Sequence, residues 1–274
     1  MKVFITADLE GVAGVVSWDQ TLPSGSGYGQ ACRWMTDEVA ATCTAAKAAG
    51  AEKILIADSH LNRDNIDLDR LPPDVRIVRG GPRPLGMMQG IDTDDFDIAL
   101  CIGFHTGADK VGVLNHTCNG AGFQRLVLNG EQVDELDIYI RVAEYFGAPV
   151  GLVTGDKELC TSIANRYPGI HTVSVKSAIG RTSAQSISPK AAQDLIQQRT
   201  VEALSDLGQF STHKEDGPYQ LDVEFKWHHP AETLDYLPCF SRTGASSVRF
   251  NGSDILETVR ALEFLSAYKL VPYP

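Results

Sequence analysis

Short apolar runs alternate with longer amphipathic stretches over the first 156 residues of the chain. Four runs, each too short for a helix and rich in β-branched or other apolar residues, cover positions 3–7, 54–57, 98–103 and 149–154. Such runs are typical of strands buried in a parallel sheet. Between them, residues 30–49 and 135–146 have helical periodicity, and each is followed by a glycine that can end a helix. The pattern predicts an α/β fold, with an open, mostly parallel sheet and helices on both faces.

Other segments predict strands with one solvated face. Residues 126–133 surround Asn129-Gly130, a dipeptide typical of tight hairpin turns. Residues 171–176 and 220–226 alternate between apolar and polar positions, and residues 246–250 form another short strand.

The later part of the chain also contains two predicted helices. Ser188-Pro189 is a good helix start, leading into a helix that ends near residue 208, and residues 253–268 are amphipathic. Together with the strands they indicate a smaller C-terminal α+β unit. We therefore expect an α/β domain over residues 1–180 and a smaller α+β domain over residues 181–274, with the Ser/Thr-rich residues 177–188 as the only linker-like stretch.

Composition restricts the classes of function. The formal net charge is −11 and no Lys/Arg-rich run exists, so binding to a nucleic-acid backbone is not expected. No uncharged apolar run approaches the length of a membrane span, and Asp8 and Glu10 interrupt the apolar start before a signal-peptide core could form. The six scattered cysteines indicate reduced thiols rather than a disulfide framework. We expect a cytoplasmic protein that binds neither nucleic acid nor membrane.

Polar side chains follow directly after each of the four apolar runs. In chain order they are Asp8 and Glu10, Asp58 and His60, His105, and Asp156. Because the carboxyl ends of parallel strands lie along one edge of a sheet, where ligands bind, we expect these groups to converge on one crevice. Asp58 and Asp156 fit best as hydrogen-bond acceptors that orient a ligand histidine or a loop amide.

A metal site explains this convergence best. Asp8 and Glu10 are two positions apart, so both carboxylates can address one cation if the strand geometry persists. A third carboxylate is expected from Glu135 at a helix start, with its neighbours Glu131 and Asp134 as alternatives. Three carboxylates and two imidazoles suit two divalent ions, one carboxylate bridging, and such sites accept zinc, cobalt or manganese.

Each residue has an ordinary interpretation when taken singly. A strand-end aspartate is often a helix or turn cap, and a strand-end histidine is often a hydrogen-bonded core residue. Four separate stretches meeting at one sheet edge favour the metal site over these interpretations. His116, in a glycine-punctuated loop eleven residues after His105, is a candidate proton-transfer group; without the cluster nearby it would be a loop histidine bonded to backbone.

The strand-end motifs resemble those of the D-aminopeptidase family of the dipeptide-transport operon (DppA type). The residues that carry the resemblance are Ala7-Asp8-Leu9-Glu10-Gly11, Ala57-Asp58-Ser59-His60, Gly103-Phe104-His105 and Asn115-His116. The resemblance extends over nearly the whole chain, including Val175-Lys176 and Gly180-Arg181 in its later part.

This resemblance implies a metallo-aminopeptidase with two zinc ions per chain. The metal ligands would be Asp8, Glu10, His60, His105 and Glu135, with Asp8 bridging, and His116 would be the catalytic histidine. It further implies ring-shaped homo-oligomers, stacked into decamers, that hydrolyse the N-terminal residue of short peptides, especially D-residues. Hydroxide generated at the metals would attack the scissile carbonyl, with His116 stabilising the oxyanion or transferring a proton.

Two other classes of function stay open. Another two-metal hydrolase, an amidase or a phosphoesterase, could use the same ligands, although a phosphoesterase would gather basic side chains near the metals. Arg63 and Lys110 are the nearest candidates. A non-catalytic peptide-binding protein would need neither five ligand-type residues nor a further histidine. The sequence gives neither the native metal nor the preferred N-terminal residue, its chirality or the peptide length.

Overall fold

Seven strands form the larger sheet of the computed structural model, which describes residues 1–212 and 216–268. Their order is β3-β2-β1-β4-β7-β8-β9, and neighbours are parallel except for β8 and β9. The strands are β1 (Lys2–Ala7), β2 (Lys53–Asp58), β3 (Arg76–Val78), β4 (Ile98–Phe104), β7 (Val150–Asp156), β8 (His171–Gly180) and β9 (Ser183–Ser186). The four apolar runs are thus central strands, as predicted.

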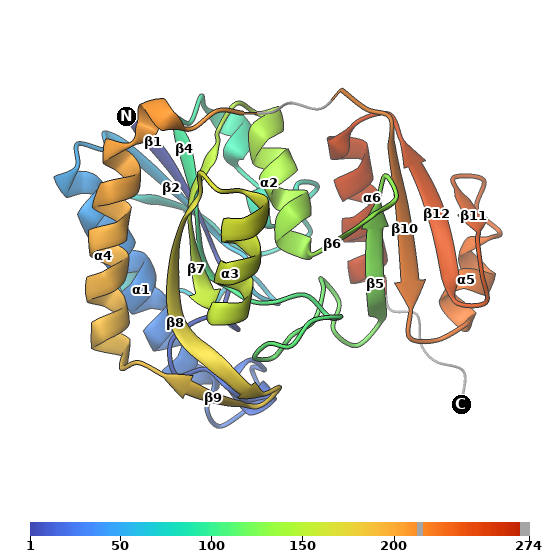
Figure 1. The fold of residues 1–274 in the computed structure, drawn as a ribbon, viewed down its shortest axis with the longest axis horizontal. Coiled ribbons are helices and arrows are strands. Elements are labelled where there is room, and N and C mark those ends of the chain that lie inside the picture. Colours follow the sequence, from blue (N-terminus) through green and yellow to red (C-terminus); the bar gives the residue numbers. More distant parts are fainter. Residues whose placement is uncertain (213–215, 269–274) are drawn as a thin grey trace.

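Helices cover both faces of this sheet (Figure 1). On one face lie α1 (Tyr28–Ala48) and α4 (Pro189–Ser205), and on the other α2 (Glu135–Tyr145) and α3 (Lys157–Arg166). Alternate residues of β1 point to opposite faces: Val3 and Ile5 belong to the cluster with α1 and α4, whereas Phe4 belongs to the cluster with α2 and α3. The predicted fold class is confirmed.

A second, antiparallel sheet lies beside the first, in the strand order β11-β12-β10-β5-β6 (Figure 1). Its strands are β5 (Phe123–Leu128), β6 (Glu131–Val133), β10 (Tyr219–Phe225), β11 (Phe240–Arg242) and β12 (Ser247–Gly252). The helices α5 (His229–Leu234) and α6 (Ile255–Ala267) accompany it. Leu136 of α2, Leu262 of α6 and Leu221 of β10 share one buried cluster, so the two sheets are joined through α2 and α6.

The chain passes between the two sheets more than once. Strands β5 and β6, with the predicted turn at Asn129-Gly130, belong to the second sheet, and α4 packs against α1 on the first. Each sheet with its helices therefore takes in chain from both sides of residue 180, and the domain boundary stays a prediction. The expectation of a linker over residues 177–188 is wrong, because most of this stretch forms the β8–β9 hairpin.

Two glycines allow the turn after β1 to lie directly on the end of β4. The amide of Gly11 donates to the carbonyl of Gly103 at 2.8 Å. A β-carbon on Gly11 would lie 1.8 Å from the carbonyl oxygen of Phe104. Gly103 has φ +73°, and a β-carbon there would lie 2.3 Å from the carbonyl oxygen of Asp8. This approach brings residues 8–11 beside the segment that carries His105.

A buried lysine holds the same turn from the other side. Lys176 is 3% exposed, and its ammonium donates to three backbone carbonyls, those of Glu10, Val12 and Val15. Burial lowers the pKa of Lys176 to about 8, opposed by nearby carboxylates. Glu38, fully buried in α1, accepts the amide of Ala13 at 2.9 Å, and burial raises its pKa to about 7. Two buried charged groups therefore fix residues 10–15.

None of the six cysteines forms a disulfide. Within residues 1–212 and 216–268, no helix combines the length and the apolar character that crossing a membrane requires.

Gly11→Ala should destabilise the fold, because the new methyl group overlaps backbone atoms that cannot rotate away. We expect a loss of about 1–3 kcal/mol in the free energy of unfolding, measured by denaturant titration. Gly169→Ala is the matched control, since nothing lies within 4 Å of a β-carbon at Gly169. An unchanged stability in Gly11→Ala would show that the turn does not need its close contact with β4.

Candidate metal centre

The five expected ligands come together at the carboxyl edge of the parallel sheet. Each side chain follows the end of a strand or begins a helix, and each residue is at most 6% exposed: Asp8, Glu10, His60, His105 and Glu135. Glu131, the alternative to Glu135, lies at the start of β6 with an exposed side chain. Asp134 is the N-cap of α2 and pairs with Lys110 at 2.6 Å.

Asp8 lies between the two imidazoles. Its Oδ1 is 3.2 Å from Nδ1 of His60, and its Oδ2 is 3.5 Å from Nε2 of His105. Glu10 Oε2 lies 2.9 Å from the same nitrogen of His60, and Glu135 Oε1 lies 3.3 Å from the same nitrogen of His105. The cluster therefore consists of two carboxylate–imidazole groups that share one aspartate.

The outer nitrogen of each ring faces a backbone carbonyl. His60 Nε2 is 2.8 Å from the oxygen of Thr21, and His105 Nδ1 is 3.0 Å from that of Thr106. A carbonyl can only accept, so each outer nitrogen carries a proton. In the neutral rings the inner nitrogens then present lone pairs to the carboxylates. This arrangement is typical of metal-binding histidines.

Asp58 and Asp156 support the loops that carry the two histidines. Asp58 accepts the side-chain amide of Asn65 at 2.7 Å, and the same amide nitrogen donates to the carbonyl of His60. Asp156 accepts the hydroxyl of Thr106 at 2.5 Å and caps α3 through the amide of Leu159. Both aspartates, the last residues of β2 and β7, therefore orient loop groups, as the sequence predicted.

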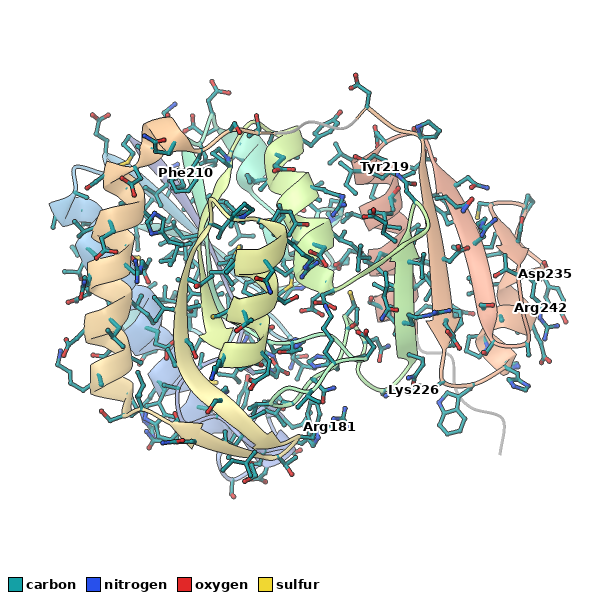
Figure 2. All side chains as sticks on the ribbon, in the orientation of Figure 1. Arg181, Phe210, Tyr219, Lys226, Asp235 and Arg242 are labelled. Carbon is teal, nitrogen blue, oxygen red and sulfur yellow. The ribbon has the colours of Figure 1, made fainter. Side chains whose placement is uncertain are left out.

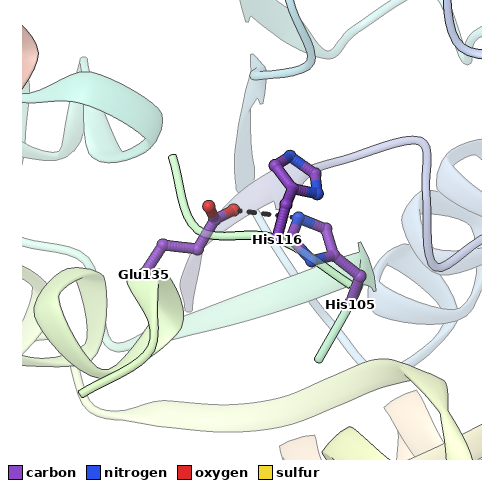
Figure 3. Close-up of side chains that lie close together, drawn as sticks. All are labelled: His105, His116 and Glu135. Atoms are coloured by element: carbon purple, nitrogen blue, oxygen red, sulfur yellow. Dashed lines mark ion pairs between the residues drawn. The ribbon is translucent and has the colours of Figure 1, made fainter. Parts of the chain in front are cut away.

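His116 lies over the cluster. Its ring stacks on that of His105, with centroids 4.0 Å apart and planes 11° apart. Figure 3 shows the two stacked rings, with Glu135 at the start of α2 directed towards His105. His116 Nδ1 is 2.9 Å from the carbonyl oxygen of Leu114, and Nε2 is 4.0 Å from Glu10 Oε1.

Burial and mutual contact shift the pKa of every group here. Burial, together with Glu10, raises the pKa of Asp8 to about 7. Burial opposes ionisation of Glu10, but His60 holds its pKa well below the ordinary value. Burial also disfavours charged imidazoles, yet the carboxylates raise the pKa of His60 and of His105 well above the usual range. Burial and the neighbouring His105 lower the pKa of His116.

The donor set fits divalent cations. Two buried atoms, Glu10 Oε2 and His105 Nε2, have no hydrogen bond of good geometry among the described residues. One oxygen or nitrogen from each of Asp8, Glu10 and His105 lies within 4.8 Å of the others, as does one from each of His105, His116 and Glu135. Carboxylate oxygens and imidazole nitrogens are ligands of zinc and of related transition metals.

A cavity of about 1290 Å³ opens over this cluster. Asp8, Glu10, His60, His116 and Glu135 line it, whereas His105 is 1% exposed and lies beneath His116. Segments that accompany both sheets form its wall: Trp18 and Arg181 come from loops of the larger sheet, Lys226 follows β10, and Glu263 belongs to α6.

Several of these wall residues could not be found from the sequence. Glu263 of α6 accepts the hydroxyl of Tyr139 at 2.7 Å and pairs with Arg63 at 2.6 Å. The helical pattern predicts α6, but not that its polar face meets a metal site. The helical repeat of α2 does indicate one wall residue: Tyr139 lies four residues after Glu135 and therefore on the same face of the helix.

The chain is similar to known proteins over almost its whole length. A family model described as D-aminopeptidase matches residues 1–264. A D-aminopeptidase of Bacillus subtilis (strain 168) is 30% identical over 264 residues, which are 96% of this chain and 95% of the relative. A solved structure, described as the Zn-dependent D-aminopeptidase DppA from Bacillus subtilis, a self-compartmentalizing protease, superposes with a TM-score of 0.95 at 26% identity over the whole of both chains. The family match spans both sheets and every residue of the cluster, and the chain therefore belongs to the D-aminopeptidase family.

Proposed function

We propose that the protein is a metal-dependent aminopeptidase that removes the N-terminal residue, preferably a D-residue, from short peptides. The observation that carries this is the buried cluster in which Asp8 directs one oxygen to each of two imidazoles. Each imidazole also contacts a second carboxylate, and a cavity large enough for a peptide opens above. Family membership and the D-aminopeptidase relatives support the choice of substrate.

The geometry suggests two ligand sets that share Asp8. One consists of Asp8, Glu10 and His60, and the other of Asp8, His105 and Glu135. The Zn-dependence stated for the structural relative favours zinc at both. Divalent ions held here would lower the pKa of a water molecule and polarise the scissile carbonyl.

His116 is proposed as the proton-transfer residue. Its Nδ1 faces the carbonyl of Leu114, so in the neutral ring the proton lies on Nδ1 and the lone pair on Nε2. Because His116 lines the cavity, Nε2 can accept a proton from the attacking water and return it to the leaving amine. Stacking on His105 and an edge contact with Trp18, at 5.7 Å between centroids, hold the ring in place.

The two basic residues that the sequence offers for phosphate binding are each paired with a carboxylate. Arg63 pairs with Glu263 and Lys110 pairs with Asp134, each at 2.6 Å. This pairing removes both residues as phosphate ligands, and the match to the D-aminopeptidase family favours a peptidase over a phosphoesterase. We also propose that the protein forms a ring-shaped homo-oligomer, a decamer of stacked rings, and the self-compartmentalizing structural relative supports an oligomer. We also propose that the protein acts in the cytoplasm.

A metal-reconstituted assay on paired L- and D-alanyl dipeptides tests the function directly. We expect release of the N-terminal residue, faster for the D-peptide, that a chelator abolishes and added zinc restores. Phosphate monoesters should not be cleaved. Metal-loaded protein that cleaves neither dipeptide would overturn the proposal, and chelator-resistant hydrolysis would overturn its metal dependence.

His116→Ala should separate metal binding from chemistry. We expect kcat to fall by at least ~10²-fold, the usual scale for losing a proton-transfer group, while bound metal stays near the wild-type level. The matched control is His228→Ala, an exposed histidine outside the cavity, which should change neither quantity. Metal lost together with activity in His116→Ala would make His116 a ligand.

The two glutamates near α2 provide a second test. Glu135→Gln should weaken one metal site and reduce turnover sharply, because Glu135 is buried against His105. Glu131→Gln, which changes an exposed side chain on β6, should do neither. Metal titration monitored by calorimetry compares the variants; loss of one metal in Glu131→Gln alone would reverse the assignment.

A further inference from the structure

Basic residues without acidic partners gather on the cavity wall. Arg63 is neutralised by Glu263, and the remaining acidic residues of the lining belong to the metal cluster. Four basic side chains of the lining have no carboxylate within 4.0 Å among residues 1–212 and 216–268: Arg83, Arg181, Lys226 and Arg260. Acidic residues outnumber basic ones by 35 to 24 in the whole chain, so composition does not explain this local excess of positive charge.

Two of these residues are each connected to His116 through one intermediate residue. Arg181, at the tip of the β8–β9 hairpin, lies over the ring of Trp18 at 5.2 Å, and Trp18 contacts the ring of His116. The ammonium of Lys226 donates to the carbonyl of Gly120. A β-carbon on Gly120 would lie 3.0 Å from His116 Cδ2, so this backbone packs directly on the imidazole.

Arg181 and Lys226 come from different sheets but line the same cavity. Figure 2 shows Arg181 on the hairpin of the larger sheet and Lys226 at the end of β10 in the smaller one, both near the lower edge of the molecule. Burial and the charge of Arg181 lower the pKa of Lys226. An anion that enters this cavity between the two cations is attracted by both of them.

Both cations keep hydrogen-bond donors for such an anion. Arg181 uses Nε and Nη2 to hold the side chain and the carbonyl of Asn115, both at 3.1 Å, which leaves the hydrogens of Nη1. Lys226 uses one of its three ammonium hydrogens on Gly120. A carboxylate, with two oxygens that each accept hydrogen bonds, matches this pair.

We propose that Arg181 and Lys226 bind the C-terminal carboxylate of a short peptide whose scissile bond lies beside His116. This inference rests on the proposed aminopeptidase function. The ring centroids of His116 and Trp18 are 5.7 Å apart, and the guanidinium carbon of Arg181 lies 5.2 Å from the centroid of the Trp18 ring. An extended chain advances ~3.3–3.6 Å per residue, so at most about three residues span this separation beyond the cleaved bond. The subsite therefore selects di- to tetrapeptides with a free C-terminus.

Kinetics on a D-alanyl dipeptide and its C-terminal amide test the subsite, since the amide removes only the negative charge. Wild-type protein should have a KM for the amide about tenfold above that for the free peptide, and added salt should reduce the ratio. Lys226→Met should bring the ratio close to one, and Lys226→Arg should restore it. Lys190→Met, at an exposed lysine of α4 outside the cavity, is the control and should keep the wild-type ratio. A wild-type ratio of one, or a ratio unchanged in Lys226→Met, overturns the proposal.

Binding of an N-acetylated dipeptide separates this inference from the proposed function, because a blocked amine makes the ligand resistant to an aminopeptidase. The acetyl-dipeptide with a free carboxylate should bind metal-loaded wild-type protein about tenfold more tightly than its amide in calorimetry, and Lys226→Met should remove the difference. This outcome supports the subsite even if no peptide is hydrolysed. Equal binding of the two ligands overturns the subsite. So does tight binding of the free acid that persists in Lys226→Met, since the metals would then hold the carboxylate. Neither result bears on peptide hydrolysis.

Discussion

The direction of two imidazole lone pairs governs the architecture around the site. His60 and His105 each commit the outer ring nitrogen to a backbone carbonyl, so the inner nitrogen of the neutral ring faces carboxylates that also carry lone pairs. Only a proton or a metal cation can lie between such groups. Buried carboxylates without this compensation would cost several kcal/mol each, about the scale of the whole stability of a domain. The close turn at Gly11 and the ends of β2 and β4 all serve to keep these groups facing one another.

The sequence predicted the part of the site that parallel strands deliver. Asp8, Glu10, His60 and His105 directly follow buried strands, and the geometry of a parallel sheet places all strand ends at one edge. Glu135 was harder to place, because the chain first leaves the sheet to form β5 and β6 and then returns as α2. Its position at a helix start is compatible with a metal ligand, but no local sequence pattern predicts where that helix packs on the sheet.

Local composition conflicts with tertiary context at two places. The Ser/Thr-rich residues 177–188 lack the apolar alternation of a half-buried strand, because β9 is a largely exposed edge strand, and their composition therefore predicts a linker where the structure has a hairpin. Arg181 lies at the tip of that hairpin and Lys226 at the end of a strand in the other sheet. Their meeting at one cavity depends on how α2 and α6 join the two sheets, and no periodicity in the sequence specifies this packing.

The buried ammonium of Lys176 is an internal cation that holds the turn bearing Glu10. It is covalently part of the chain and satisfies three carbonyls, so the turn does not rely on an exchangeable ion for its shape. A metal-free form of the protein would then keep the shape of this turn. Metal uptake at the proposed site would require diffusion of the ion through the cavity and loss of its water shell, but no refolding of the turn.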